Sequence, residues 1–144
     1  MPHRGTDDPE NVLFNDMHKP FADYALDEDT MAAWSGLIQV RDAVNAALEA
    51  ARAEKKIGKS LEAKVTVPSS LMAEARQVDM DTLADILIVS QVSVSSDVTE
   101  VQVEVAQGGK CERCWKVLPG VGSDAAHPTL CPRCGAVVAK LPQF

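Results

Sequence analysis

All four cysteines of this 144-residue chain lie close to its C-terminal end and form two pairs. Two residues separate Cys111 from Cys114, and the same gap separates Cys131 from Cys134 after sixteen intervening residues. This spacing is typical of a tetrahedral metal site, because each pair of thiolates fits on one tight turn. Zinc is the expected ion, and a rubredoxin-like iron site, which needs the same four thiolates, is the main alternative. Two disulfides are less consistent with the sequence, because residues 1–20 lack the apolar stretch of a secretory signal.

A site with four cysteine ligands leaves no coordination position open for a substrate, so we expect the zinc to be structural. It would replace the hydrophobic core that a segment of about 30 residues cannot build. His127 lies between the two pairs and is an alternative ligand, although four cysteines already complete the set. The sequence contains no Gly-rich phosphate loop, nucleophile elbow or His-Glu metal motif, so we expect no catalytic residue in this chain.

Basic residues surround the cysteines, whereas the rest of the chain is acidic. Residues 106–144 carry five Lys and Arg against two Asp and Glu (net +3), while residues 1–105 carry nine against nineteen (net −10). Phosphate binding depends on Lys and Arg, so the basic segment is the candidate nucleic-acid surface. Its candidate residues are Lys110, Arg113, Lys116 and Arg133, with Trp115 available to stack on an unpaired base. The alternatives are that these cations merely face solvent and that Trp115 packs over the metal site.

A long helix is expected ahead of the cysteines. Apolar residues recur at helical spacing from Leu37 to Ala51, which predicts a helix that begins at Asp29 or Thr30 and ends near Gly58. A helix of about 27 residues is roughly 40 Å long, which is too long for one compact domain of this size. The sequence therefore indicates a helix that belongs to a larger helical bundle, after a mostly irregular lead-in.

Shorter patterns indicate strands between this helix and the cysteines. Residues 61–67 alternate between apolar and polar types, which predicts a half-buried strand that Pro68 ends. The apolar run over residues 86–94 predicts a more central strand, and residues 101–105 predict its antiparallel partner in a β-hairpin. The expected fold is α+β, with a long helix from a helical bundle, a small mixed α/β unit with a β-hairpin, and a C-terminal zinc ribbon with four cysteine ligands. The expected boundaries are residues 1–59, 60–107 and 108–144.

Several stretches, in their order and spacing, resemble the C-terminal end of bacterial isoleucyl-tRNA synthetases. They are WSGLIQVRDAVNAALEAARAEKKIGKSLEAKVTV, LADILIVSQV, VEVAQGGKCERCWKV and HPTLCPRCGAVV. The resemblance covers about residues 30–139. It implies that the long helix ends an α-helical anticodon-binding domain and that a small α/β junction follows. It also implies a closing zinc ribbon, similar to that of formamidopyrimidine-type DNA glycosylases, that helps to engage the tRNA.

The class I signatures of that family, His-Ile-Gly-His and Lys-Met-Ser-Lys-Ser, are absent, and KIGKS at residues 56–60 lies at a predicted helix end without a nucleotide-binding fold. The resemblance therefore implies a C-terminal fragment of a cytoplasmic, ATP-dependent isoleucine–tRNA ligase, without a catalytic centre of its own. The expected partners are tRNA(Ile) and the upstream domains of the ligase, and no membrane. The expected function is recognition of the anticodon side of the tRNA, with Arg52, Lys55 and Lys56 adding to the RNA-binding residues. The alternatives are a purely structural zinc module, a protein-interaction adaptor and a free-standing nucleic-acid-binding ribbon.

Overall fold

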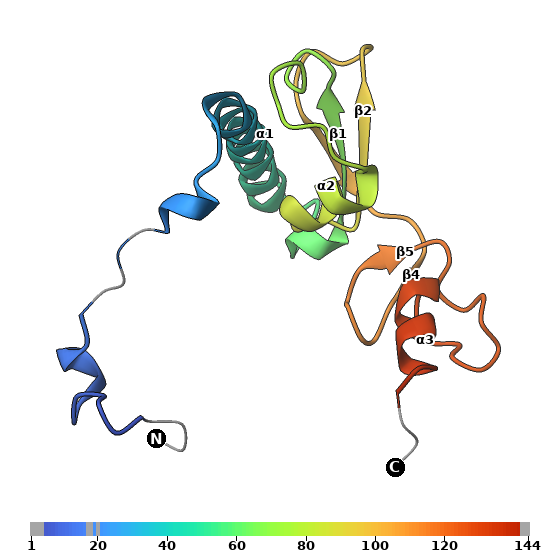
Figure 1. Ribbon diagram of the computed structural model, residues 1–144. Helices are drawn as coiled ribbons and strands as arrows, with labels where there is room; N and C mark the ends of the chain where they lie inside the picture. The colour runs from blue at the N-terminus through green and yellow to red at the C-terminus, as the bar shows by residue number, and fades with distance from the viewer. Residues whose placement is uncertain (1–4, 17–18, 20, 142–144) are drawn as a thin grey trace.

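The computed structural model describes residues 5–16, 19 and 21–141 (Figure 1). It is an α+β fold, as predicted. Its helices are α1 (Glu28–Ala53), α2 (Met80–Ile86) and α3 (Pro132–Val138), and 3-10 turns occur at Val12–Phe14, Ala22–Tyr24 and Ser60–Glu62. Its strands are β1 (Ala63–Pro68), β2 (Gln91–Ser95), β3 (Gln102–Val105), β4 (Gly109–Lys110) and β5 (Val117–Leu118). No helix in the described residues is long and apolar enough to cross a membrane.

Helix α1 begins close to its predicted start but ends earlier than predicted. The Asp27 carboxylate caps its first turn by accepting a 2.7 Å hydrogen bond from the Thr30 N–H, which lowers the pKa of Asp27. At the other end Lys55, not Gly58, adopts the left-handed conformation, with φ of 60°. The Lys55 and Lys56 N–H groups donate to the carbonyls of Arg52 and Ala51, each at 2.9 Å, as in a Schellman motif.

The side chain of Ile57 explains why the helix ends before Gly58. Ile57 is buried, with 5% of its surface exposed, in the same core as Leu48. A helix that continued at about 100° per residue would place Ile57 about 180° around the axis from Leu48, on the solvent side. The chain therefore leaves the helix at Ala53 and returns Ile57 to the core.

One face of α1 packs against the sheet. Its buried residues are Leu37, Val40, Val44, Leu48 and Ala51, the stripe that the sequence predicted. They share one core with the buried face of β1 (Ala63, Val65 and Val67) and with the end of α2, and Figure 1 shows α1 lying beside the sheet. Trp34 and Ile38, which lie beside this stripe, are 36% and 47% exposed.

The predicted β-hairpin between residues 86–94 and 101–105 is not formed, and the central strand is β1. The strand order is β2-β1-β3, with β2 parallel and β3 antiparallel to β1, so that Val65 lies opposite both Val92 and Val103. The prediction was wrong because the apolar run is not one strand. Ile86 ends α2, and Ile88 is 53% exposed with φ of 56°, so the chain turns sharply before β2 begins.

Helix α2 has a cap that can be tested by pH. The Asp79 carboxylate accepts hydrogen bonds from the Thr82 N–H (2.9 Å) and hydroxyl (2.7 Å), which lower the pKa of Asp79. We expect Asp79→Ala to lower the melting temperature by roughly 2–4 °C at neutral pH. Because the folded-state pKa is below the ordinary value of 3.8, this difference is complete above that pH and disappears as the pH falls through the lowered pKa. Thermal unfolding measured from pH 2 to 7 checks this. Asp79→Asn, which keeps a capping oxygen, is the control and should retain most of the stability.

Candidate metal centre

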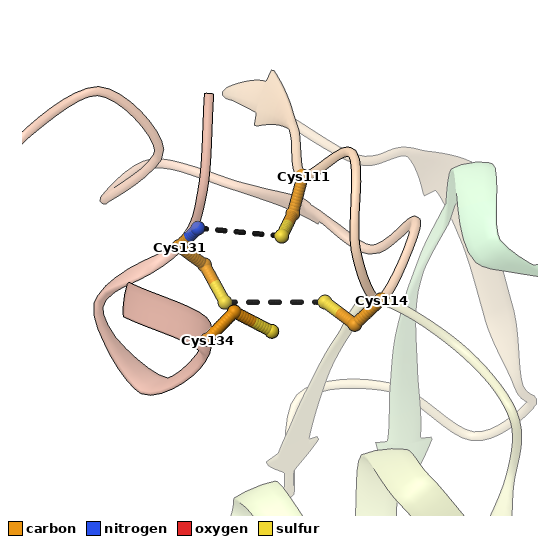
Figure 2. Close-up of side chains that lie close together, drawn as sticks. All are labelled: Cys111, Cys114, Cys131 and Cys134. Carbon is orange, nitrogen blue, oxygen red and sulfur yellow. Dashed lines mark hydrogen bonds between the residues drawn. The ribbon is translucent and has the colours of Figure 1, made fainter. Parts of the chain in front are cut away.

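The four cysteine side chains converge on one point between the two turns that carry them (Figure 2). All four Sγ atoms lie within 4.8 Å of one another, and those of Cys114 and Cys131 are 3.9 Å apart. Sulfur ligands at about 2.3 Å from a tetrahedral zinc ion lie about 3.8 Å from each other, so this arrangement fits one shared ion. A disulfide requires sulfurs at about 2.0 Å, and all four cysteines are free. The four residues that the spacing predicted as ligands are therefore brought together.

The first pair lies on the turn between β4 and β5, which pair as antiparallel strands. The turn is closed by two hydrogen bonds, from the Cys111 N–H to the Lys116 carbonyl (2.9 Å) and from the Trp115 N–H to the Cys111 carbonyl (2.8 Å). Trp115 has φ of 65°, so a tryptophan occupies the left-handed position that glycine would adopt more easily.

The second pair lies at the beginning of α3. Cys131 is the N-cap residue, Pro132 is the first residue of the helix, and Cys134 lies in the first turn. The Cys131 N–H donates to Sγ of Cys111 at 3.3 Å, which links the two pairs. Gly135 is helical rather than left-handed. A Cβ atom there would lie 3.1 Å from an Asp124 carboxylate oxygen, a tight contact that the aspartate side chain would have to relieve by moving a few tenths of an ångström.

Burial and hydrogen bonds make the thiols unequal as acids. Burial opposes ionisation of Cys111, but the N–H groups of Cys114, Cys131 and Arg113 together lower its pKa to about 6. Burial raises the pKa of Cys114 to about 12 and also raises that of Cys131. Three or four thiolates cannot share this small space without a cation, because their charges repel and their shells of water are lost. A bound divalent ion supplies the charge that keeps them ionised.

Zinc affinity is therefore expected to rise by at least about hundredfold per pH unit between about pH 6.5 and 8, because Cys114 and Cys131 must each lose a proton to bind. Competition with a chromophoric chelator at several pH values measures this slope. A slope of less than tenfold per unit would show that the thiols are already ionised before the metal arrives. Repeating the titration with cobalt(II), which gives a visible thiolate absorption band, is the control for tetrahedral sulfur ligation.

The predicted RNA-binding residues around the cysteines have different surroundings. Lys110, Arg113 and Arg133 are all exposed, and Trp115 is 59% exposed, with its indole N–H donating to the Glu112 carbonyl at 3.1 Å. Trp115 thus lies on the surface and is not among the residues packed around the sulfurs. Lys116 differs, because its side chain is only 13% exposed and its Nζ atom lies 2.5 Å from the carboxylate of Asp85.

The predicted residues at the end of α1 are partly engaged with neighbours. Arg52 donates to the Ser60 hydroxyl at 2.6 Å and pairs with Glu49, while Lys56 pairs with Glu54 at 3.0 Å. Lys55 is exposed at the helix cap.

Three residues that the sequence did not single out, Asp85, Ser90 and Gln91, contact the cysteine-bearing segment directly. Ser90 is 3% exposed, and its hydroxyl donates to the Leu61 carbonyl (2.6 Å) and accepts from the Val117 N–H (2.7 Å). A serine immediately after an apolar run was the available signal, because a buried hydroxyl needs partners.

Comparisons with known proteins agree with this geometry. Residues 108–136 match the family described as "Zinc finger found in FPG and IleRS". The isoleucine–tRNA ligase of Geobacillus thermodenitrificans is 42% identical over 144 residues, and that of Gloeobacter violaceus is 47% identical over 123 residues. The ligase of Staphylococcus epidermidis is 41% identical over 143 residues.

These alignments cover 90%, 76% and 92% of this chain but only 15%, 12% and 15% of the respective ligases. The chain thus spans less than a sixth of the length of the relatives it matches, which is consistent with a fragment that lacks the catalytic domain. The zinc-finger match and the four converging cysteines support one structural zinc site. The chain belongs to the isoleucine–tRNA ligase family, as a C-terminal fragment that carries the zinc finger.

Proposed function

We propose that this segment binds the anticodon side of tRNA(Ile) for a cytoplasmic ligase whose other domains bind ATP and attach isoleucine. The observation that carries the proposal is the position of two cations on the cysteine turns. Arg113 lies in the first cysteine turn, with its Nη1 atom 3.7 Å from Sγ of Cys134, and Arg133 follows Cys131 in the second. Both arginines thus lie on the turns that carry the cysteine ligands. They are suited to positioning a phosphate backbone, which Arg binds through two parallel hydrogen bonds.

The other candidate residues would extend this surface. Lys110 precedes the first turn and Trp115 lies within it, so that the exposed indole is available to stack on an unpaired base beside the arginines. Arg52, Lys55 and Lys56 would add contacts from the end of α1. In this proposal the division at residues 59 and 107 separates the end of an anticodon-binding domain, a junction and the zinc ribbon. Residues 1–105 carry a net charge of −10, which would repel the tRNA backbone and keep it on the basic zinc ribbon.

The direct test changes both arginines in the complete ligase. We expect Arg113→Glu combined with Arg133→Glu to weaken tRNA(Ile) binding at least tenfold and to reduce the slope of log affinity against log salt by about two, one for each lost phosphate contact. Mobility-shift or filter-binding titrations at several salt concentrations measure both quantities. Aminoacylation rates then show whether the weaker binding slows the attachment of isoleucine.

The matched control is Lys140→Glu, which reverses an exposed charge in the same module. Lys140 follows the C-terminal end of α3, whereas Cys131 and Cys134 lie at the beginning of that helix. Zinc content must stay at one ion per chain in every variant. Unchanged tRNA affinity and aminoacylation in the double variant would remove the RNA-binding role. The structural alternative would then stand, in which zinc loss lowers stability without a specific defect in RNA binding.

A further inference from the structure

The segment has two separate cores, and the surface where they meet is polar. The first core joins α1, α2 and the three-stranded sheet, which we call the body (residues 28–106). The second consists of Cys111, Cys131 and Cys134 with a few partly buried neighbours, which we call the zinc module (residues 108–141). A hollow of about 280 Å³ lies between α2 and the two cysteine turns. Because apolar packing does not fill this junction, its hydrogen bonds and ion pairs must determine how the module sits on the body.

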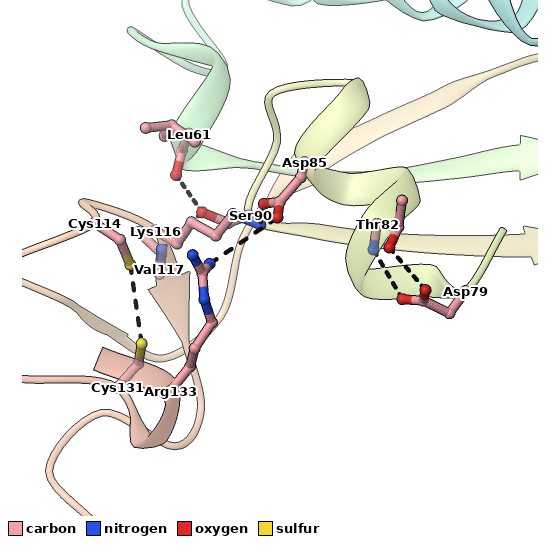
Figure 3. A network of polar contacts seen from close by, with 10 residues as sticks. All are labelled: Leu61, Asp79, Thr82, Asp85, Ser90, Cys114, Lys116, Val117, Cys131 and Arg133. Atoms are coloured by element: carbon pink, nitrogen blue, oxygen red, sulfur yellow. Dashed lines mark hydrogen bonds and ion pairs between the residues drawn. The ribbon is translucent and has the colours of Figure 1, made fainter. Parts of the chain in front are cut away.

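Asp85, near the end of α2, contacts both cysteine turns (Figure 3). One carboxylate oxygen lies 2.5 Å from Nζ of Lys116, and the other lies 4.0 Å from Nη1 of Arg133. The two contacts are unequal, because the side chain of Lys116 is 13% exposed and that of Arg133 is 69% exposed. Lys116 is therefore largely withdrawn from solvent and directed at the body, whereas most of the Arg133 side chain is exposed to solvent.

Ser90, which directly precedes β2, and Gln91, its first residue, complete the junction. The Ser90 hydroxyl bridges the Leu61 carbonyl of the body and the Val117 N–H of the module. The Gln91 side-chain amide donates to the carbonyls of Gln107 (2.6 Å) and Val117 (3.0 Å). Val117 directly follows Lys116, so both contacts act on the strand that carries the lysine. In Figure 3 Ser90, Asp85 and Lys116 lie together on the side of the cysteine turns that faces the body.

We propose that Lys116 is a positioning residue, and that its ion pair with Asp85 is a latch that fixes the orientation of the zinc module on the body. The RNA part of this inference rests on the proposed function. In that role the latch determines where Arg113 and Arg133 face, and Lys116 does not itself bind phosphate. The burial of Lys116 favours this, because its side chain is 13% exposed while that of Asp85 is 53% exposed, so the ammonium faces the body and would have to leave Asp85 before it could contact RNA.

The latch can be tested on the zinc-loaded 144-residue chain without RNA. Backbone ¹⁵N relaxation should give one rotational correlation time for body and module in the original chain. Asp85→Lys and Lys116→Asp should each release the module, and its correlation time should fall about twofold relative to the body, as for a small domain on a linker. The exchanged pair, Asp85→Lys with Lys116→Asp, should restore a single correlation time. Zinc content and the chemical shifts of the cysteine turns verify that each module remains folded.

Binding of tRNA(Ile) to the complete ligase then separates positioning from direct contact. The variant Lys116→Asp should bind at least fivefold more weakly, and the exchanged pair should recover the affinity, although position 116 remains acidic. A pair that restores tumbling but not tRNA affinity would overturn the positioning role and make Lys116 a phosphate ligand. A module that tumbles with the body in both single variants would overturn the latch. If the single variants change tumbling but not tRNA binding, the latch stands and its role in positioning the arginines for RNA is overturned, whereas failure of the proposed RNA-binding function is read separately from the double arginine variant.

Discussion

Cys134→Ser is expected to abolish zinc binding and to unfold residues 108–141, while the body remains folded. Cys134 is fully buried, and serine has nearly the same shape but a hydroxyl that is a poor zinc ligand at neutral pH. Zinc binding to small structural sites contributes about 10–16 kcal/mol, which exceeds anything that three buried cysteines and four partly buried neighbours supply by packing. Native mass spectrometry reports the zinc, and ¹⁵N–¹H spectra report which residues lose their dispersed signals.

The control is Cys114→His, at the only one of the four cysteines that is not fully withdrawn from solvent. Histidine is a common zinc ligand in three-cysteine sites, so this variant should keep one zinc ion and a folded module with reduced affinity. The body should give the same signals in both variants, because its core contains none of the four cysteines. A metal-free Cys134→Ser chain with an ordered α3 would show that the module folds without its ion.

The metal centre was predictable from sequence because its geometry is local. Each two-residue gap fixes one turn, so only one long-range event, the meeting of the two turns, had to be inferred. The stripe on α1 was predictable for the same reason. The end of α1 was not, because Lys55 adopts a left-handed conformation that the burial of Ile57 imposes from outside the helix.

The sheet pairing and the junction depend on contacts between distant residues. Residues 101–105 alternate as strand residues do, but nothing in the alternation says that Val103 lies opposite Val65 rather than opposite a residue of β2. Lys116 is a basic residue beside the cysteines, so the sequence alone makes it a candidate for RNA binding. Only the position of Asp85, 31 residues earlier, shows that its charge is already paired. Sequence identifies which residues are able to bind, and folding determines which of them remain free.

Gly36→Ala is also expected to have a large effect. It should lower the free energy of unfolding, although alanine favours helices more than glycine does. Gly36 lies inside α1, where alanine would ordinarily stabilise a helix by up to about 1 kcal/mol. Here a Cβ atom would lie 2.4 Å from the Glu74 carbonyl oxygen and 2.8 Å from its carbon, both of them backbone atoms. The loop cannot easily retreat, because the Arg76 N–H donates to the Ala33 carbonyl at 2.8 Å and the Arg76 guanidinium lies 5.4 Å from the Trp34 ring centre. We expect a loss of about 2–3 kcal/mol in the free energy of unfolding.

Urea denaturation followed by circular dichroism at 222 nm measures this loss, and the neighbouring Ser35→Ala is its control. Ser35 is exposed, and its hydroxyl bonds back to the Met31 carbonyl at 2.9 Å, so alanine there should change stability by less than about 0.5 kcal/mol. Zinc content should be unchanged in both variants, because Gly36 packs in the body and the metal is held by the module. A glycine within an otherwise regular helical pattern is itself a signal of close approach, since its cost in helix stability needs a compensating contact. A more stable Gly36→Ala variant would mean that the loop over residues 70–78 does not pack on α1 at this position, and α1 would then be free to accept another neighbour there.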